Sequence, residues 1–358
     1  MAEFAYEPEP AGVALAPGES AREVAGKSPW RLAGRRLARN RVALAALALF
    51  VLIVAVSFAA PIWANSIAHV DPFASNVNGT TVVDGKRVEV IQQGGGPLGI
   101  GENPIGPTWQ TNYLLGADNQ GRDVFARVLY GGRASLLIGV GSALISCVVA
   151  LVLGLVAGFF RGSIDVVLSR IMDLVWAFPI FLLAISLSTV LLTAPDGLQW
   201  GPVHIDPSSL WIPTVIIAVV YVPYVYRPVR GQVLSVREKE YVEAAVALGA
   251  SRLRLMFVEI LPNVITTIVV MLPLMIATTI LTESALSFLS IGVQPPNASW
   301  GTIIQDGQGL LYTRPWVAIA PGIMIVLTVL SLNVLGDGVR DALDPRAKLR
   351  LKAQGARR

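Results

Sequence analysis

The sequence has little charge for its length. Only 15% of its 358 residues are Asp, Glu, Lys or Arg, whereas 54% are hydrophobic, and the mean hydropathy is +0.61. A soluble chain of this size needs more charged side chains to cover its surface, so the composition excludes an ordinary soluble protein. Because lipid solvates apolar side chains directly, the composition is typical of a protein that spans a membrane.

Cysteine and histidine are also scarce. The one cysteine, Cys147, lies in an apolar run, cannot form an intrachain disulfide and is predicted to be a small buried side chain. His69 and His204 are far apart and have no ligand residues beside them, so no metal site is predicted. The chain also lacks a glycine-rich phosphate loop ending in Lys-Ser or Lys-Thr, and we expect it to bind no nucleotide or other cofactor itself.

Catalysis at membrane depth would need a nucleophile close to a base or to metal ligands. The serines of the apolar runs have no His, Asp or Glu beside them; they are Ser142, Ser146, Ser186 and Ser188. We expect these hydroxyl groups to form hydrogen bonds between helices instead. The chain is therefore predicted not to be an enzyme.

Six apolar runs are long enough, or nearly so, to cross a bilayer, which takes about 20 residues. They contain no Asp, Glu, Lys, Arg or His in their interiors, and they cover Val42–Ala60, Ala134–Phe160, Leu174–Ala194, Trp211–Tyr226, Val264–Thr282 and Trp316–Gly336. The sequence therefore predicts an all-α polytopic membrane protein with six transmembrane helices. An ion-coupled carrier usually needs charged groups within its helices, so this alternative is poorly supported.

The basic residues predict how the chain is oriented, because cytoplasmic loops carry an excess of Lys and Arg. If the N-terminus is cytoplasmic, the inner segments are 1–41, 161–173, 227–263 and 337–358, and they hold 22 of the 28 basic residues. We therefore expect a multi-pass membrane protein with both termini in the cytoplasm.

The first long connection, residues 61–133, is predicted to lie outside the cell. Within it, Thr80–Val90 alternates in the manner of a β-hairpin, and Asp84-Gly85 supplies the positive φ angles of a tight turn. The Gly94–Pro97 stretch is expected to interrupt regular structure.

Residues 118–133 are predicted to form a short amphipathic helix. Arg122, Arg127 and Arg133 would lie on its outer face, and Asp118 and Asp123 would form ion pairs with them. Two roles remain open for these arginines: a structural one, and contact with an external partner together with Trp300 and the 283–315 loop. We favour the structural role, and assign a partner role to the hairpin.

The connection between the fourth and fifth runs contains a predicted pair of short cytoplasmic helices. Tyr241, Ala245 and Leu248 recur at helical spacing, and Gly249 is typical of a helix C-terminus. Ser251 is placed to cap a second helix, and Pro262 suits the first turn of the following one. The pair is either a connector resting at the membrane surface or a docking element for a cytoplasmic partner.

Four segments resemble the C-type permease of binding-protein-dependent ABC importers for dipeptides, oligopeptides and nickel. They are Glu243-Ala244-Ala245 with Gly249 and Leu261-Pro262-Asn263 (the "EAA" loop), Leu115–Asp123 with Gly132–Leu136, Gln294-Pro295-Pro296 with Trp300-Gly301, and Gly336–Arg346. The similarity covers most of the chain from about Arg31 to Arg346. It departs from the family at Glu259, where His is frequent, and in a longer insert near 73–112.

The resemblance implies the type I ABC importer permease fold, with coupling helices that dock on an ATPase subunit. It implies that the docking loop comprises Tyr241, Glu243, Ala244, Ala245, Leu248, Gly249 and Ala250. It implies an external motif of Gly121, Arg122, Asp123, Arg133, Pro296, Trp300 and Gly301.

The implied partners are a homologous B-type permease, two ATPases that bind ATP and Mg, an external substrate-binding protein and the bilayer, with no nucleic acid. The implied function is ATP-driven import of peptides, with nickel or another small solute as the alternative. We divide the chain into a cytoplasmic tail (1–41), a first transmembrane helix (42–60), an external segment (61–133), a five-helix core (134–336) with the coupling loop at 237–260, and a cytoplasmic tail (337–358).

Overall fold

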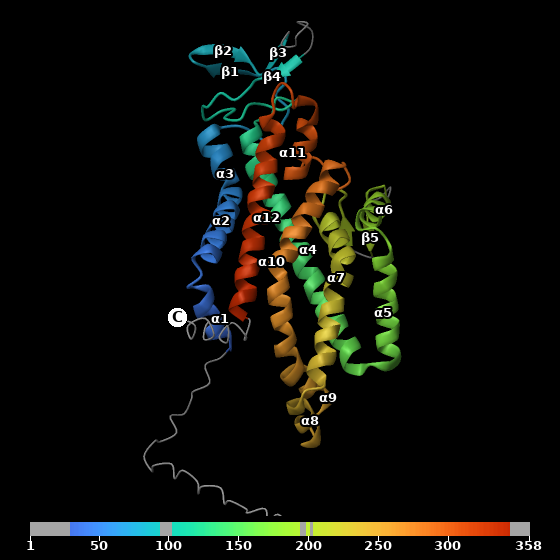
Figure 1. Cartoon of the computed structure of the whole chain (residues 1–358). Helices are drawn as coiled ribbons and strands as arrows, with labels where there is room; N and C mark the ends of the chain where they lie inside the picture. The colour runs from blue at the N-terminus through green and yellow to red at the C-terminus, as the bar shows by residue number, and fades with distance from the viewer. Residues whose placement is uncertain (1–28, 94–101, 194–197, 201–202, 344–358) are drawn as a thin grey trace, which may run out of the picture.

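A computed structural model describes residues 29–93, 102–193, 198–200 and 203–343 as a bundle of long helices with small strands at one end (Figure 1). The α-helices are α1 (Pro29–Leu37), α2 (Arg41–Phe58), α3 (Ala60–Ile62), α4 (Val124–Phe160), α5 (Gly162–Ala177), α6 (Ile180–Leu192), α7 (Trp211–Arg237), α8 (Glu240–Ala247), α9 (Arg252–Arg254), α10 (Leu261–Phe288), α11 (Trp300–Gly307) and α12 (Trp316–Leu343). Two π-helical turns, η1 (Trp63–Ala68) and η2 (Leu255–Ile260), and a 3-10 turn, η3 (Gln308–Leu310), join some of them.

The strands form three antiparallel pairs, β1 (Thr80–Val83) with β2 (Lys86–Glu89), β3 (Ile91–Gln93) with β4 (Glu102–Pro104), and β5 (Leu198–Trp200) with β6 (Val203–Ile205). The predicted hairpin at Thr80–Val90 is confirmed: Val83 pairs with Lys86, and the turn residues Asp84 and Gly85 have φ angles of 50° and 76°. The predicted break at Gly94–Pro97 lies outside the described residues.

Five helical segments are long and apolar enough to cross a membrane: α2, α4, α7, Arg252–Phe288 and α12. The third predicted run corresponds instead to the pair α5 and α6, which are bent by 91° and make a sixth crossing if they count as one span. The break follows Ala177, because Pro179 disfavours helical geometry in the residue before it. The prediction of an all-α polytopic membrane protein is confirmed.

Most predicted helix limits are too narrow. The segment 161–173, predicted as a loop, forms most of α5; α7 continues past Tyr226 to Arg237, and α12 continues past Gly336 to Leu343. Hydropathy marks where a helix is apolar, whereas helical hydrogen bonding continues through charged residues that reach water or a partner. The helices therefore extend beyond the apolar runs.

The prediction that no ionisable residue lies inside the membrane helices is wrong at Glu283. The run was taken to end at Thr282, but α10 continues to Phe288, and the Glu283 side chain is fully buried. Ser287 Oγ donates a hydrogen bond of 2.7 Å to one carboxyl oxygen, and Ser284 Oγ lies 3.3 Å from the other. Hydrogen bonds of this kind offset the free-energy cost of burying a polar group.

Helices α4 and α7 approach closely through small residues and hydroxyl groups. Gly154 faces the Val229 side chain, and Ser142 and Ser146 each donate a 2.8 Å hydrogen bond to a backbone carbonyl of α7, those of Thr214 and Ala218. Such contacts replace the hydrophobic driving force that is missing between helices in lipid. The predicted helix-to-helix role of these two serines is confirmed.

Helices α4 and α10 meet in the same way at Gly139. Thr279 Oγ1 donates a 2.8 Å hydrogen bond to the Gly139 carbonyl oxygen, and a Cβ atom at position 139 would overlap the Ile280 side chain. The absence of a side chain at Gly139 thus sets the distance between the two helices.

Gly139→Ala is expected to lower the thermal stability of the detergent-purified protein by a few degrees, since overpacking costs about 1–3 kcal/mol. The control is Gly322→Ala in α12, where a Cβ atom would have nothing within 4 Å. The melting temperatures of both variants are measured by tryptophan fluorescence. Equal melting temperatures for the two variants would contradict the close contact.

Candidate functional site

The connection between α7 and α10 forms two short helices joined by a glycine turn. Helix α8 ends at Ala247, Gly249 has a φ of +80°, and the amides of Gly249 and Ala250 donate to the carbonyls of Val246 and Ala245. This pair of hydrogen bonds is a Schellman C-cap, which requires a left-handed residue. The predicted roles of Gly249 and of Ser251, whose hydroxyl accepts from the Arg254 amide at 3.3 Å, are confirmed geometrically.

Helix α8 is held to the bundle mainly by Val242, which is buried. Ala245 and Ala250 are half-buried against the same core, whereas Leu248 is 89% exposed and Glu243 is also exposed. The face shared by Tyr241, Ala245 and Leu248 is therefore not the one that packs on the core, because Val242 takes the inward position. The docking loop instead presents most of its side chains outward.

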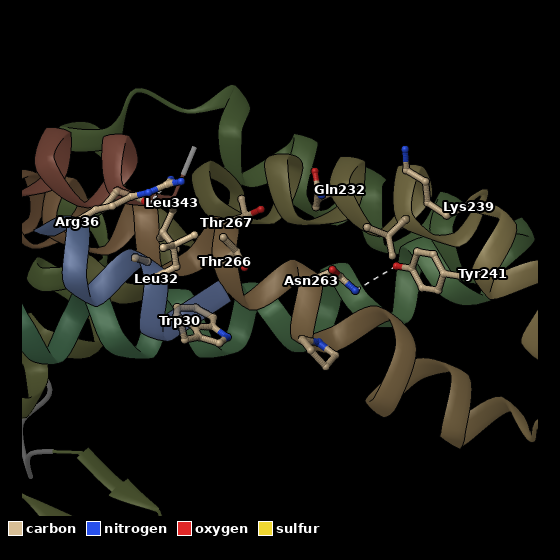
Figure 2. Close-up of a pocket in the computed structure, with 14 residues that line it drawn as sticks. Trp30, Leu32, Arg36, Gln232, Lys239, Tyr241, Asn263, Thr266, Thr267 and Leu343 are labelled. Atoms are coloured by element: carbon tan, nitrogen blue, oxygen red, sulfur yellow. Dashed lines mark hydrogen bonds between the residues drawn. The ribbon is translucent and has the colours of Figure 1, made fainter. Parts of the chain in front are cut away.

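Tyr241 ties α8 to the start of α10. Its hydroxyl accepts a 3.1 Å hydrogen bond from Asn263 Nδ2 (Figure 2). Asn263 Nδ2 also donates to the Glu259 carbonyl at 2.8 Å. Burial raises the pKa of Tyr241, and the negative charge of Glu259 raises it further. Glu259 thus lies beside the loop at the position where the family often has His.

Two hollows flank this loop. A crevice of about 630 Å³ is lined by both acidic and basic side chains, among them Arg161, Glu238 and Glu243. On the other side, a cleft of about 750 Å³ lies between α1 and the start of α10, with Trp30, Arg36 and Tyr241 among its walls (Figure 2). The loop therefore stands free on two sides.

At the opposite end of the bundle, two arginines and two aspartates form a cluster. Arg122 Nε lies 2.7 Å from Asp118 Oδ2, and the guanidinium groups of Arg122 and Arg127 lie 2.8 and 2.9 Å from Asp306 Oδ2. Arg127 and Asp118 are buried, so the predicted outward position of Arg127 is wrong. The predicted short helix is also wrong, because α4 begins at Val124 and continues without a break to Phe160.

Asp123 does not pair with the arginines. It caps α4 by accepting from the Ala126 amide at 2.8 Å, and it accepts from the Tyr113 amide at 2.6 Å. Burial raises the pKa of this carboxyl group, whereas its backbone hydrogen bonds lower it. Gly121 has a φ of +71°, and its backbone lies against Asn76. Both motif residues thus shape the N-terminal end of α4.

The remaining external motif residues are also structural in their placement. Trp300 is fully buried, and its indole N–H donates to the Val128 carbonyl at 3.0 Å. Gly301 allows α11 to touch the backbone of Ser284, and Arg133 lies over the rings of Phe58 and Tyr130. Trp300 therefore cannot contact an external partner in this conformation. Pro296 remains exposed.

Three features escaped the sequence reasoning. Val242 is an ordinary apolar residue in a helical pattern that fitted two faces, and Asp306 lies more than 170 residues from the arginines that it contacts. Arg227 and Asp173, on α7 and α5, form an exposed ion pair at 2.9 Å. The sequence signal for this pair was an acidic residue on one helix and a basic residue on the other.

The two ends of the molecule thus differ in what they offer. At the end that carries the strands, the motif residues are mostly buried and hold the segment before α4 to α4 and α11. At the other end, α8 is a short helix that is anchored by Val242 and has most of its side chains exposed. In the described part of the chain, no three His, Cys, Asp or Glu residues are grouped to hold a metal ion. The geometry of α8 suits contact with another protein.

Two family models match the chain. The family described as the binding-protein-dependent transport system inner membrane component matches residues 150–349, and the N-terminal transmembrane domain of oligopeptide transport permease C matches residues 28–78. The first match covers the coupling loop, and the second covers α1, α2 and the start of the external segment.

The chain is also similar to named relatives over most of its length. A glutathione transport system permease of Pectobacterium atrosepticum is 35% identical over 91% of this chain and 94% of its own length. A dipeptide transport system permease of Alkalihalophilus pseudofirmus is 35% identical over 90% and 91%, and an oligopeptide permease of Bacillus subtilis is 34% identical over 90% and 91%. The MetNI methionine ABC transporter aligns with a TM-score of 0.48 and 15% identity, over 61% of this chain and 96% of that chain. The chain belongs to the family of binding-protein-dependent transport system inner membrane components, and is a permease subunit of an ABC importer.

Proposed function

We propose that this permease imports di- and oligopeptides and that it forms one half of their path across the bacterial inner membrane. The observation that carries this proposal is the identity of about one third with peptide-transport permeases over nine-tenths of both chains. Nickel or another small solute is the alternative cargo. The other half of the path is assigned to a homologous B-type permease.

The energy for transport is assigned to two partner ATPases, which bind ATP and Mg. Helix α8 supports this assignment because Glu243 and Leu248 are exposed while Val242 anchors the helix to the core. The proposed docking surface comprises Tyr241, Glu243, Ala244, Ala245, Leu248, Gly249 and Ala250. Closure of the ATPases would displace this surface.

A displacement of α8 has a direct route into the membrane. Only two residues separate the end of α7 at Arg237 from the start of α8, and Tyr241 is hydrogen-bonded to Asn263 at the start of α10. A push on α8 would therefore move both helices as packed, rigid elements. In this proposal the chain converts motion of the ATPases into a change of the path.

The same proposal gives the orientation of the chain. The coupling helices α8 and α9 lie at one end of the bundle and β1 to β4 at the other (Figure 1). With the ATPases in the cytoplasm, the strands face the external substrate-binding protein, and both termini are cytoplasmic. The division into segments 1–41, 42–60, 61–133, 134–336 and 337–358 follows from this placement.

Peptide import is tested with the complete complex and its binding protein in proteoliposomes. We expect di-, tri- or longer peptides to stimulate ATP hydrolysis and to accumulate, and nickel chelates to do neither. Stimulation by nickel alone would contradict the peptide assignment and leave the ATP-coupled mechanism in place. The control is the same complex without binding protein.

Gly249→Val is expected to reduce ATP-driven uptake by about tenfold or more, because a β-branched residue is strained at positive φ. Gly249→Asn is the matched control, since Asn adopts the left-handed conformation more readily. Uptake and the amount of co-purified ATPase are measured for both. Unchanged uptake by the Val variant in an assembled complex would contradict the coupling role.

The external hairpin is proposed to contact the binding protein, since Val82 and the turn residues Asp84 and Gly85 are exposed. Replacing residues 81–88 by a short Gly-Ser turn is expected to weaken binding-protein affinity. Val90 is retained because it is buried, and its amide donates to the Gly79 carbonyl at 2.9 Å. An unaltered affinity, measured by surface plasmon resonance on the complex in nanodiscs, would rule out this contact.

A further inference from the structure

An exposed ion pair lies between α5 and α7. Arg227 Nη2 is 2.9 Å from Asp173 Oδ1, and their side chains are 45% and 56% exposed. Asp173 lies eleven residues after the start of α5 and Arg227 ten residues before the end of α7, so both lie about 15 Å along their helices from those ends. Both residues lie on helices that are long and apolar enough to belong to spans, and exposure of such charged groups to lipid would be costly.

Aromatic side chains lie next to this ion pair and extend from it across α7. The Arg227 guanidinium lies 4.6 Å from the centre of the Trp176 ring, and Trp176 stacks on Tyr224 with ring centres 6.0 Å apart. Tyr221 meets Tyr224 edge-on at 6.4 Å, and its hydroxyl bonds to Thr282 of α10 at 2.8 Å. Tyr221 is buried, whereas the other four residues are exposed, and we call Asp173, Trp176, Tyr224 and Arg227 the α5–α7 strip.

The strip lies beside a break in the third span. Helix α5 ends at Ala177, one residue after Trp176, and α6 begins at Ile180 in a direction 91° away. Phe178, within the break, is 53% exposed. Non-helical backbone at membrane depth is tolerated only where it is buried in protein or lines a water-filled cavity. The exposed break and the exposed ion pair thus indicate that this surface faces water.

A second ion pair between the same two helices provides a contrast. Arg230 binds both carboxyl oxygens of Asp165, with Nη2 2.6 Å from Oδ2, and the Asp165 side chain is only 14% exposed. Ser169 also donates to Asp165. This pair holds α5 against α7, so the exposed pair is not needed for the same purpose.

We propose that the α5–α7 strip lines the aqueous translocation path and contacts the two charged ends of a peptide. Arg227 presents donors suited to a carboxylate terminus, and Asp173 accepts from an ammonium terminus. Trp176 and Tyr224 offer flat apolar faces that tolerate different side chains. An exposed ion pair contributes little net stability. Arg227 and Asp173 can therefore exchange each other for the two charged termini of a peptide. The peptide part of this inference rests on the proposed function, whereas the aqueous path does not.

Water access is tested by cysteine labelling, for which the chain needs only one background substitution, Cys147→Ser. Trp176→Cys and Tyr224→Cys are compared with Val51→Cys, an exposed position on the apolar helix α2, and with Asp84→Cys in the external hairpin. A charged, membrane-impermeant thiol reagent is added to both sides of proteoliposomes containing the complete complex. We expect labelling at 176 and 224 to exceed that at 51 clearly. Rates as low as at 51 would overturn the aqueous path.

Peptide contact is tested by uptake of peptides with free, N-acetylated or C-amidated ends. Arg227→Gln is expected to reduce uptake of free peptides roughly tenfold, as for the loss of one hydrogen bond to a charged group. Arg227→Gln should reduce uptake of the C-amidated peptide much less than uptake of the free peptide. Asp173→Asn should likewise reduce uptake of the N-acetylated peptide much less than uptake of the free peptide. Asp165→Asn, the control, should change assembly or stability without a preference for terminal groups.

A charge swap separates contact from structure. Asp173→Arg combined with Arg227→Asp preserves an ion pair, so full recovery of free-peptide uptake would make the pair structural and overturn the contact. We expect no such recovery. If the wild-type complex transports no peptide at all while positions 176 and 224 are labelled, the proposed function and peptide contact fail, and the aqueous path stands.

Discussion

The requirement that backbone polar groups be satisfied within the membrane governs this molecule. Its spans are helical, and where helices touch, hydroxyl groups and small residues make the contacts. Ser142 and Ser146 bond across to α7, and Thr279 bonds from α10 to the carbonyl of Gly139. Even the buried carboxyl group of Glu283 is met by serine hydroxyls. Polar groups at membrane depth thus hold helices together or mark a surface that does not face lipid.

The same helices connect the two functional ends. Helix α4 carries Arg127 in the outer ionic cluster and ends beside Arg161, which pairs with Glu238 next to the coupling loop. Helix α10 begins at the Tyr241–Asn263 hydrogen bond and reaches α11 where Gly301 touches Ser284. Because these helices are long and closely packed, the motion that we propose the ATPases impose on α8 would be carried along the bundle. A rigid bundle with an exposed helix at one end suits the proposed role of a subunit that partner ATPases move.

Local signals were read correctly from the sequence where chemistry limits the choices. Asp84-Gly85 and Gly249 take the positive φ angles that their residue types suggested, and the apolar runs located the spans. Burial was harder to predict. Glu283 looked like the end of a run because its serine partners become visible only when α10 is folded, and Arg127 looked exposed because Asp306 is remote in sequence. The choice of Val242 as the anchor of α8 depended on how that helix rotates against the core.

Cross-linking tests most directly whether α8 transmits ATPase motion into the membrane, as we propose. A single cysteine in place of Leu248, which is 89% exposed, would be introduced with Cys147→Ser and joined by a short bifunctional reagent to the assembled ATPases. The account predicts a specific permease–ATPase product and a loss of uptake that reverses when the link is cleaved. Absence of that product from an assembled, active complex, or uptake that continues at its full rate with the link in place, would contradict the account.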